Sequence, residues 1–298
     1  MLITIKDYKT TAVIDSTGAQ LISLTDASGR EYIWQRDPKY WKKSSPLLFP
    51  VVGNCRNDRT ILEDCIYTIE KHGFCRERDF DVSQESSSRA VFSMCDTPDT
   101  HRAYPYAFCL SLAYELKDGV LFLEYQVENR DQRGMWYSIG AHPGFNCPME
   151  EGFSFEDYQL VFEKEEDTVS IPYDLDQLHF CPSKPGAALK GSVLSLNREL
   201  FKNDAVFFDN LKSRAVSILN PATGRGVEVG FPDFETVAFW TLYPEPAPYL
   251  CIEPWNGSGI YENEDDQLSH RHHIQHLRPG NRRSYIMTIR ILGLFSSK

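Results

Sequence analysis

Short runs of alternating hydrophobic and polar residues, each closed by turn residues, limit most strongly what this chain of 298 residues can fold into. Hydrophobic side chains fall on every second position of residues 121–127, which places them on one face of a β-strand. Residues 109–116 form another strand-like run, and Asp118-Gly119 lies between the two runs. An Asp-Gly pair in that position is typical of a tight turn, so the sequence predicts a β-hairpin here.

The same pattern continues towards the C-terminus. Residues 214–219 and 227–229 flank the turn residues 221–224, which predicts a second hairpin. Residues 285–292 predict a closing strand. Turn residues recur about every ten positions, as β-sandwiches and barrels require.

Helical patterning is scarce in this sequence. Only residues 198–203 could form one or two helical turns, and the polar residues 262–276 predict a surface loop before the last strand. The chain has no alternation of strands with helices, no internal repeat and no low-complexity linker. The sequence therefore predicts an all-β protein with a single continuous domain over residues 1–298.

The charge balance argues against several classes of partner. The net charge is −11, and no run of Lys or Arg is longer than three residues. Nucleic acids and membrane surfaces attract clustered cations, so we expect neither as a partner. No apolar run approaches the roughly 20 residues of a membrane-spanning helix. Residues 1–6 are not a basic leader before a long apolar stretch, so no signal peptide is expected.

Eight cysteines occur at irregular spacings, without a Cys-x-x-Cys motif. Cys109 and Cys251 lie in apolar, strand-like runs, where a reduced cysteine packs as a small hydrophobic residue. Reduced cysteines are typical of the cytosol, and the sequence therefore predicts a reduced, cytoplasmic protein.

Two titratable residues stand out because each ends an apolar strand-like run. His142 follows residues 137–141, and Pro143-Gly144 interrupts the strand directly after it. Glu253 follows residues 248–252, where a buried carboxylate is unfavourable unless it has a partner. Imidazole titrates near neutral pH, and burial raises the pKa of a carboxyl group towards the same range. The two residues could be a general acid and a general base, although Glu253 could also belong to a structural ion pair.

His72 and Arg56 are further candidates. Gly73 beside His72 allows a turn or the close approach of a ligand, although a single histidine more often has a structural role. The guanidinium of Arg56 could bind hydroxyl or phosphate oxygens. The alternative for Arg56 is a surface salt bridge with Asp58 or Asp64.

Four histidines gather near the C-terminus among arginines and other polar residues. Metal ligands have to converge on one point and need supporting partners, which this pattern does not indicate, so we expect no metal site. The sequence also has no glycine-rich phosphate loop and no Gly-x-Ser-x-Gly motif. The histidines of this cluster are His270, His272, His273 and His276.

Several further motifs occur in a fixed order along nearly the whole chain. They are residues 18–24, 29–34, 37–41 and 46–53, His72-Gly-Phe, residues 141–146, Glu253-Pro-Trp, and residues 277–280. In this combination the sequence resembles the aldose 1-epimerase (galactose mutarotase-like) superfamily, and within it a LacX-like bacterial branch. The resemblance implies a large antiparallel two-sheet sandwich, often called a supersandwich, with a sugar bound in a cleft across one sheet.

The resemblance also implies an activity and roles for particular residues. The activity is a cofactor-free interconversion of the α and β anomers of an aldose. Glu253 corresponds to the general base that takes the proton of the anomeric hydroxyl, and His142 to the general acid that protonates the ring oxygen. His72 and Arg56 correspond to groups that position the sugar and stabilise charge on the ring oxygen. This sequence has Asn-Cys before Arg56 where the branch commonly has Gly-Arg, so the register of the arginine stays open.

An acidic substrate-binding residue is also implied, with Asp204 as our choice and Asp209 as the alternative. The expected ligand is a small-molecule sugar, and neither its identity nor the oligomeric state is specified. A hexose 6-phosphate would require cations at the cleft, for which Arg56, Arg76 and Arg78 are candidates. A non-catalytic sugar-binding or sensor protein on the same fold is a further alternative, because fold alone does not determine function.

Overall fold

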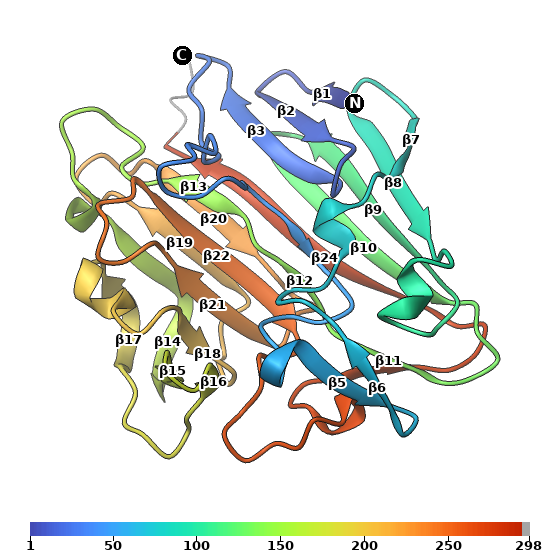
Figure 1. The fold of residues 1–298 in the computed structure, drawn as a ribbon. Coiled ribbons are helices and arrows are strands. Elements are labelled where there is room, and N and C mark those ends of the chain that lie inside the picture. The colour runs from blue at the N-terminus through green and yellow to red at the C-terminus, as the bar shows by residue number, and fades with distance from the viewer. Residues whose placement is uncertain (294–298) are drawn as a thin grey trace.

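A computed structural model describes residues 1–293, and the chain is built almost entirely of β-strands (Figure 1). The described residues contain no α-helix, and therefore no helix long and apolar enough to cross a membrane. Six short 3-10 helices lie in the connections. They are η1 (Arg56–Asp58), η2 (Cys75–Glu77), η3 (Thr100–Arg102), η4 (Phe155–Asp157), η5 (Arg198–Phe201) and η6 (Leu268–His270).

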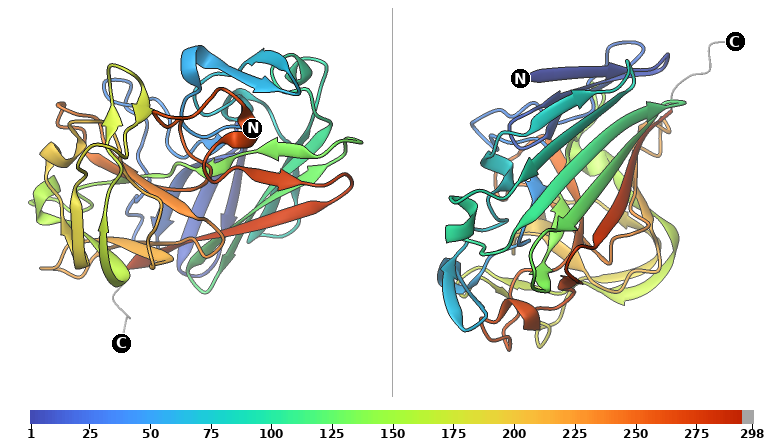
Figure 2. Two further views of the ribbon diagram at one scale, coloured as in Figure 1. Left: turned by 90° about the horizontal axis from the view of Figure 1, so that it is seen from below. Right: turned by 90° about the vertical axis from the view of Figure 1, so that its right-hand side faces the viewer.

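The larger of the two main sheets has nine strands, all paired antiparallel, and its long strands cross the molecule in Figure 2. In spatial order the strands are β17 (Ala188–Ser195), β14 (Gln159–Val169), β19 (Ala215–Leu219), β20 (Gly226–Gly230), β24 (Arg282–Leu292), β10 (Val120–Asn129), β9 (Phe108–Lys117), β8 (Arg89–Cys95) and β7 (Asp81–Gln84). The predicted hairpins and the closing strand are confirmed as β9–β10, β19–β20 and β24. Asp118 and Gly119 both have positive φ, as a two-residue turn of this kind requires.

The second main sheet has six strands and carries the residues of greatest interest. In spatial order they are β18 (Val206–Phe208), β21 (Thr236–Trp240), β22 (Tyr249–Asn256), β12 (Ile139–Ala141) and β4 (Leu47–Leu48), with β13 (Gly144–Asn146) also paired to β22. Its inner face packs on the nine-stranded sheet. Phe162 of β14, for example, contacts Phe208 of β18 and Phe239 of β21 edge to face.

All eight residues of β22 are buried, so both faces of this strand are covered. Leu250 and Ile252 point into the main core between the sheets. Because side chains alternate along a strand, Cys251, Glu253 and Trp255 point to the opposite face. The outer face of the six-stranded sheet is therefore where a site can form.

Smaller sheets and hairpins complete the molecule. They are the three-stranded sheet β1 (Leu2–Lys6), β2 (Thr10–Asp15) and β3 (Gln20–Asp26), and the pairs β5 (Arg59–Leu62) with β6 (Cys65–Thr68), β11 (Met135–Tyr137) with β23 (Gln275–Leu277), and β15 (Tyr173–Asp174) with β16 (His179–Phe180). The surface-loop prediction for residues 262–276 is wrong in part. This segment contains η6 and begins β23, and the side chains of Leu268 and Arg271 are buried.

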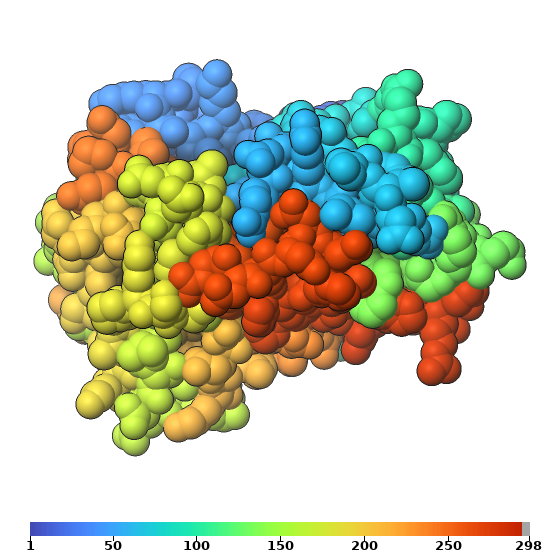
Figure 3. Space-filling model, turned by 60° about the horizontal axis from the view of Figure 1, so that its bottom comes forward, coloured from blue at the N-terminus to red at the C-terminus, as the bar shows by residue number. Residues whose placement is uncertain are grey.

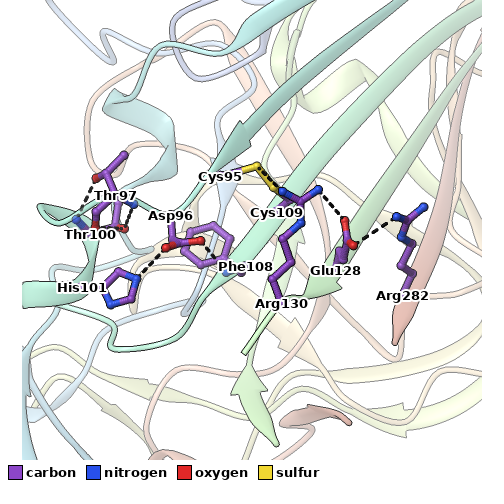
Figure 4. The surroundings of a disulfide bond; sticks show 10 residues. All are labelled: Cys95, Asp96, Thr97, Thr100, His101, Phe108, Cys109, Glu128, Arg130 and Arg282. Atoms are coloured by element: carbon purple, nitrogen blue, oxygen red, sulfur yellow. Dashed lines mark hydrogen bonds and ion pairs between the residues drawn. A yellow bond between two sulfur atoms is a disulfide. The ribbon is translucent and has the colours of Figure 1, made fainter. Parts of the chain in front are cut away.

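The prediction that all cysteines are reduced is wrong for one pair, because Cys95 and Cys109 form a disulfide (Figure 4). The two residues lie directly opposite each other in the β8–β9 register, with Cα atoms 4.1 Å apart. A spacing of 14 residues in the sequence does not reveal that register. The other six cysteines are free thiols, and the cytoplasmic location stays a prediction.

Candidate active site

A pocket of about 200 Å³ opens on the outer face of the six-stranded sheet. Three segments far apart in the sequence meet at its rim, around Asn54, Phe180 and Gly259, where backbone hydrogen bonds link residues 54, 180 and 260. Figure 3 shows these regions packed against one another, coloured blue, yellow-green and orange-red. The pocket lining includes four of the five predicted site residues: His72, His142, Asp204 and Glu253.

His142 lies in the short connection between β12 and β13. Its side chain is buried, and the indole of Trp41 stacks on the imidazole with ring centroids 4.9 Å apart. Trp240 meets the same ring edge-on at 5.7 Å. His142 Nδ1 has no hydrogen-bond partner among the described residues, while Nε2 lies 3.2 Å from Glu253 Oε2. The predicted acid–base pair is therefore in direct contact.

Glu253 is only 2% exposed, in the middle of β22. Burial is the main cause that raises the pKa of its carboxyl group well above the ordinary value, and Asp204 adds to the effect while Lys71 opposes it. Burial likewise lowers the pKa of His142 to about 3, and the charges of Lys71 and Arg76 add to the effect. The site therefore favours a neutral carboxyl group beside a neutral imidazole.

His72 lies next to this pair, with ring centroids of His72 and His142 5.6 Å apart. The backbone N–H of Gly53 donates a 3.1 Å hydrogen bond to His72 Nδ1. Because Nδ1 accepts, the proton of the neutral ring is on Nε2. Burial holds the pKa of His72 well below its ordinary value, so the ring stays neutral. The turn at Gly73 serves a close backbone approach, since a Cβ there would lie 2.1 Å from the carbonyl oxygen of Phe49.

The two aspartates proposed from the sequence have different surroundings. Asp204 lines the pocket, and its Oδ2 lies 3.7 Å from Lys71 Nζ. Asp209 instead accepts a hydrogen bond from the Tyr261 hydroxyl and pairs with His273, and it is not part of the pocket lining. The structure thus brings Asp204, and not Asp209, to Glu253 and His142.

Arg56 lies outside the pocket, contrary to the position expected for it. Its side chain is 43% exposed, donates to the backbone oxygen of Glu264 and lies 3.4 Å from Asp266. The β5–β6 hairpin follows directly, and its bridge from Ile61 to Gln267 holds this segment against the C-terminal loop. The arginine in the pocket lining is Arg76, from η2. Its closeness in sequence to His72 is the signal that could have favoured it over Arg56.

Aromatic walls are the feature of the site that sequence reasoning did not assign. Trp41, Trp240 and Trp255 line the pocket together with Tyr173 and Phe180. Trp34 anchors the segment that carries Trp41, because its indole N–H donates a 2.8 Å hydrogen bond to the Trp41 carbonyl. The indole Nε1 of Trp255 is buried without a partner in the described chain. Flat apolar faces beside free polar donors suit a ligand that has both hydrocarbon and hydroxyl surface.

The four C-terminal histidines do not converge. His270 pairs with Asp265, His272 with Glu264, His273 with Glu235, and His276 packs on the ring of Trp136. Within the described residues, the side chains placed to hold a metal ion are His142, Cys251 and Glu253, whose ligand atoms lie within 4.8 Å of one another. Any such ion would occupy the acid–base pair itself.

Fold and pocket together define a large antiparallel β-sandwich with a buried histidine–carboxyl pair in an aromatic-walled pocket. A family model described as aldose 1-epimerase matches residues 1–275. Protein LacX (plasmid) of Lactococcus lactis subsp. lactis is 34% identical, over 97% of this chain and 99% of the relative. The chain therefore belongs to the aldose 1-epimerase family.

Solved structures agree with this assignment. A galactose mutarotase related enzyme from Lactobacillus acidophilus has a TM-score of 0.93 and 30% identity, covering 98% of this chain and 97% of the other. A galactose mutarotase-like protein from Lactobacillus casei has a TM-score of 0.89 and 27% identity, covering 98% and 100%. The family resemblance and the predicted all-β, two-sheet antiparallel sandwich are both confirmed.

Proposed function

We propose that this protein interconverts the α and β anomers of an aldose by acid–base ring opening and closure. The observation that carries the proposal is the direct contact of His142 Nε2 with Glu253 Oε2 at 3.2 Å, buried in the aromatic-walled pocket. Two groups that exchange protons with oxygen atoms are the minimum that this reaction needs. Membership of the aldose 1-epimerase family supports the same reaction class.

Ring opening requires one proton to leave the anomeric hydroxyl and another to reach the ring oxygen. In our proposal the Glu253 carboxylate takes the hydroxyl proton, and the His142 imidazolium protonates the ring oxygen as the bond from C1 to that oxygen breaks. The hydroxyl oxygen becomes the aldehyde oxygen, and rotation about the C1–C2 bond presents either face of the aldehyde. Closure reverses both proton transfers and gives either anomer.

The pKa shifts of Glu253 and His142 indicate which protonation state of the pair the site favours. After ring opening Glu253 is protonated and His142 is neutral, which is the state that burial favours for both groups. The opposite state, carboxylate beside imidazolium, has the same number of protons and the same total charge. One proton moved across the 3.2 Å contact interconverts them. In this proposal ring opening leads to the protonation state that burial favours for the pair.

His72 and Asp204 complete the proposal as substrate-binding residues. The Nε2–H of His72 is a hydrogen-bond donor beside His142, suited to negative charge that develops on the ring oxygen. Asp204 offers a carboxylate that can accept a hydrogen bond from a sugar hydroxyl. Arg56 has no part in the proposal, because it lies outside the pocket.

Polarimetry of freshly dissolved α-glucose and α-galactose, repeated with their 6-phosphates, tests the proposal. We expect the wild type to accelerate mutarotation of an aldose, and Glu253→Gln and His142→Asn each to lower the rate by about 10²–10⁴-fold. Glu228→Gln on β20 and His270→Asn, whose side chain is 63% exposed, are matched controls and should retain wild-type rates. Near wild-type rates in both site variants would contradict the assignment. If no sugar were converted while sugars still bound by calorimetry, the protein would be a sugar-binding protein on this fold.

A further inference from the structure

The pocket carries positive charge although the molecule as a whole is acidic. Lys43, Lys71 and Arg76 line it, in a chain with a net charge of −11. The carboxyl groups in the same lining are those of Asp204 and Glu253, and burial favours the protonated form of Glu253. Three cationic side chains therefore face one carboxylate and one neutral carboxyl group. A neutral sugar does not need this excess, whereas an anionic ligand does.

Arg76 is the least satisfied of the three cations. Its side chain is 21% exposed, and none of its N–H groups has a hydrogen-bond acceptor among the described residues. The nearest carboxylate oxygen, of Glu77, lies 3.9 Å from Nε. A largely buried guanidinium with unused donors is unfavourable unless a ligand supplies acceptors. Its planar fork matches the two oxygens of a phosphate or a carboxylate.

The two lysines line the same pocket as Arg76, and each has a carboxylate partner. Lys43 Nζ is 2.6 Å from Glu77, whose side chain is mostly exposed and outside the pocket lining. Lys71 Nζ is 3.7 Å from Asp204, which is longer than a hydrogen bond. Lys71 can therefore approach a ligand oxygen without losing a hydrogen bond.

The cationic cluster lies beside the reacting groups. The charges of Lys71 and Arg76 both act on the imidazoles of His72 and His142. Because one pocket lining holds the cluster together with Glu253 and His142, a single ligand in this pocket can contact both. The other arginines considered from the sequence do not contribute, because Arg56 pairs with Asp266 and Arg78 with Asp99.

We propose that the substrate of this site is a monosaccharide carrying an anionic group, a phosphate ester or a carboxylate, bound by Arg76 with Lys43 and Lys71. This inference rests on the proposed function for the reaction, and it adds the class of substrate. Phosphate and carboxylate groups can each present two oxygen atoms to the guanidinium, so an experiment has to distinguish between them.

The test compares anomer exchange, followed by polarimetry or by NMR exchange spectroscopy, for neutral and anionic sugars. The neutral set is glucose and galactose, and the anionic set is their 6-phosphates and the corresponding uronic acids. We expect kcat/KM for at least one anionic sugar to exceed that of its neutral parent at least 10-fold, and added salt to reduce this ratio. The preferred member of the anionic set identifies phosphate or carboxylate as the group recognised.

Variants of two neighbouring arginines give the matched comparison. Arg76→Gln should lower the ratio of anionic to neutral kcat/KM by about 10- to 100-fold, and Arg76→Lys, which keeps the charge but not the fork, by less. Arg78→Gln should leave the ratio at the wild-type value. Thermal unfolding of each variant checks that the fold is retained. Equal kcat/KM for neutral and anionic sugars, or a ratio unchanged in Arg76→Gln, would overturn the inference.

If the protein does not catalyse anomer exchange, a binding experiment tests the substrate class separately. If no sugar is converted, calorimetric titration of wild type and Arg76→Gln with glucose, glucose 6-phosphate and glucuronate decides the anion question alone. Tighter binding of an anionic sugar that is lost in Arg76→Gln would uphold the substrate class. Equal affinities for all three ligands would reject it.

Discussion

At the scale of single residues, Glu253 shows how a requirement of the proposed reaction opposes the stability of the fold. Its carboxyl group is almost completely removed from solvent, and its Oε2 lies 3.2 Å from His142 Nε2. Burial without a full set of partners disfavours the charged form of Glu253. The proposed reaction nevertheless needs that charged form when the closed sugar is bound. Residues kept for such chemistry commonly reduce stability.

Replacement of Glu253 by glutamine should therefore stabilise the protein in a pH-dependent way. A pKa raised above the ordinary 4.5 means that the folded state binds the proton more tightly than the unfolded state. The stability contributed by this group is complete below pH 4.5 and is lost as pH rises towards the folded-state pKa. Glutamine cannot ionise, so the gain in free energy of unfolding for Glu253→Gln should grow between pH 4.5 and pH 8.

Urea denaturation at pH 4.5, 6 and 8 measures that gain. Glu228→Gln, a change of the same chemistry at the partly exposed ion pair with Arg290, serves as the control without this pH dependence. A gain that stayed constant from pH 4.5 to pH 8 would show that burial does not raise the pKa of Glu253.

At the scale of elements, the site depends on how connections approach strand ends. His72 is placed by a turn in which the N–H of residue 72 bonds to the carbonyl of Gly53, and Gly73 packs against the backbone of Phe49. This contact joins the segment before η2 to the connection that follows β4. The position of His72 beside His142 is a product of that packing and not of a strand.

Gly73→Ala should disrupt this contact. An alanine Cβ would lie 2.1 Å from the Phe49 carbonyl oxygen, and φ at this position is +71°. Gly152→Ala is the matched control, because φ there is +84° and no atom lies within 4 Å of the added Cβ. The control should cost about 1–2 kcal/mol from its backbone conformation alone. Gly73→Ala should cost about 1–3 kcal/mol more, from the overlap. Chemical denaturation of both variants measures the difference, and equal losses would refute the role given to the Phe49 contact.

The sequence predicted the positions of individual strands better than it predicted which strands pair and in which register. Alternation identified β9, β10, β19, β20 and β24, because periodicity is a local property of the chain. Pairing between strands depends on register, and the Cys95–Cys109 disulfide was missed for that reason.

The candidate site shows the same limit. His142 and Glu253 were recognisable because each ends an apolar run, and the structure brings them into contact. Arg56 and Arg76 were both visible as candidate cations, but only the packing of the β5–β6 hairpin separates the surface residue from the pocket residue. The aromatic walls come from residues 41, 173, 180, 240 and 255, which no local pattern links.

At the scale of the whole molecule, we expect the free energy of unfolding to fall at acidic pH because of the buried histidines of the pocket. The pKa of His142 is lowered from the ordinary 6.5 to about 3, and that of His72 lies well below 6.5. As pH falls below 6.5, these histidines take up protons in the unfolded state but not in the folded state. The folded state is therefore destabilised progressively between pH 6.5 and about pH 3.

The variant His142→Asn should lose less of its free energy of unfolding at acidic pH than the wild type does. Between pH 7.5 and pH 5 the wild type should lose about 2 kcal/mol more of its free energy of unfolding than the variant does. Urea denaturation across this range provides the measurement, with the exposed His270→Asn as the control that follows the wild type. Parallel curves for His142→Asn and wild type would mean that the imidazole of His142 is not held neutral in the folded protein.

Because both faces of β22 are buried, this strand limits how the molecule can unfold locally. One strand supplies Leu250 and Ile252 to the central core and Glu253 and Trp255 to the pocket. Its backbone amides therefore become accessible to solvent hydrogen exchange only when the core itself comes apart. Loops at the rim can move independently, but the pocket floor cannot loosen by itself. We therefore expect the Glu253 carboxyl group to be presented by a strand whose amides exchange slowly, and ligands to enter past the rim.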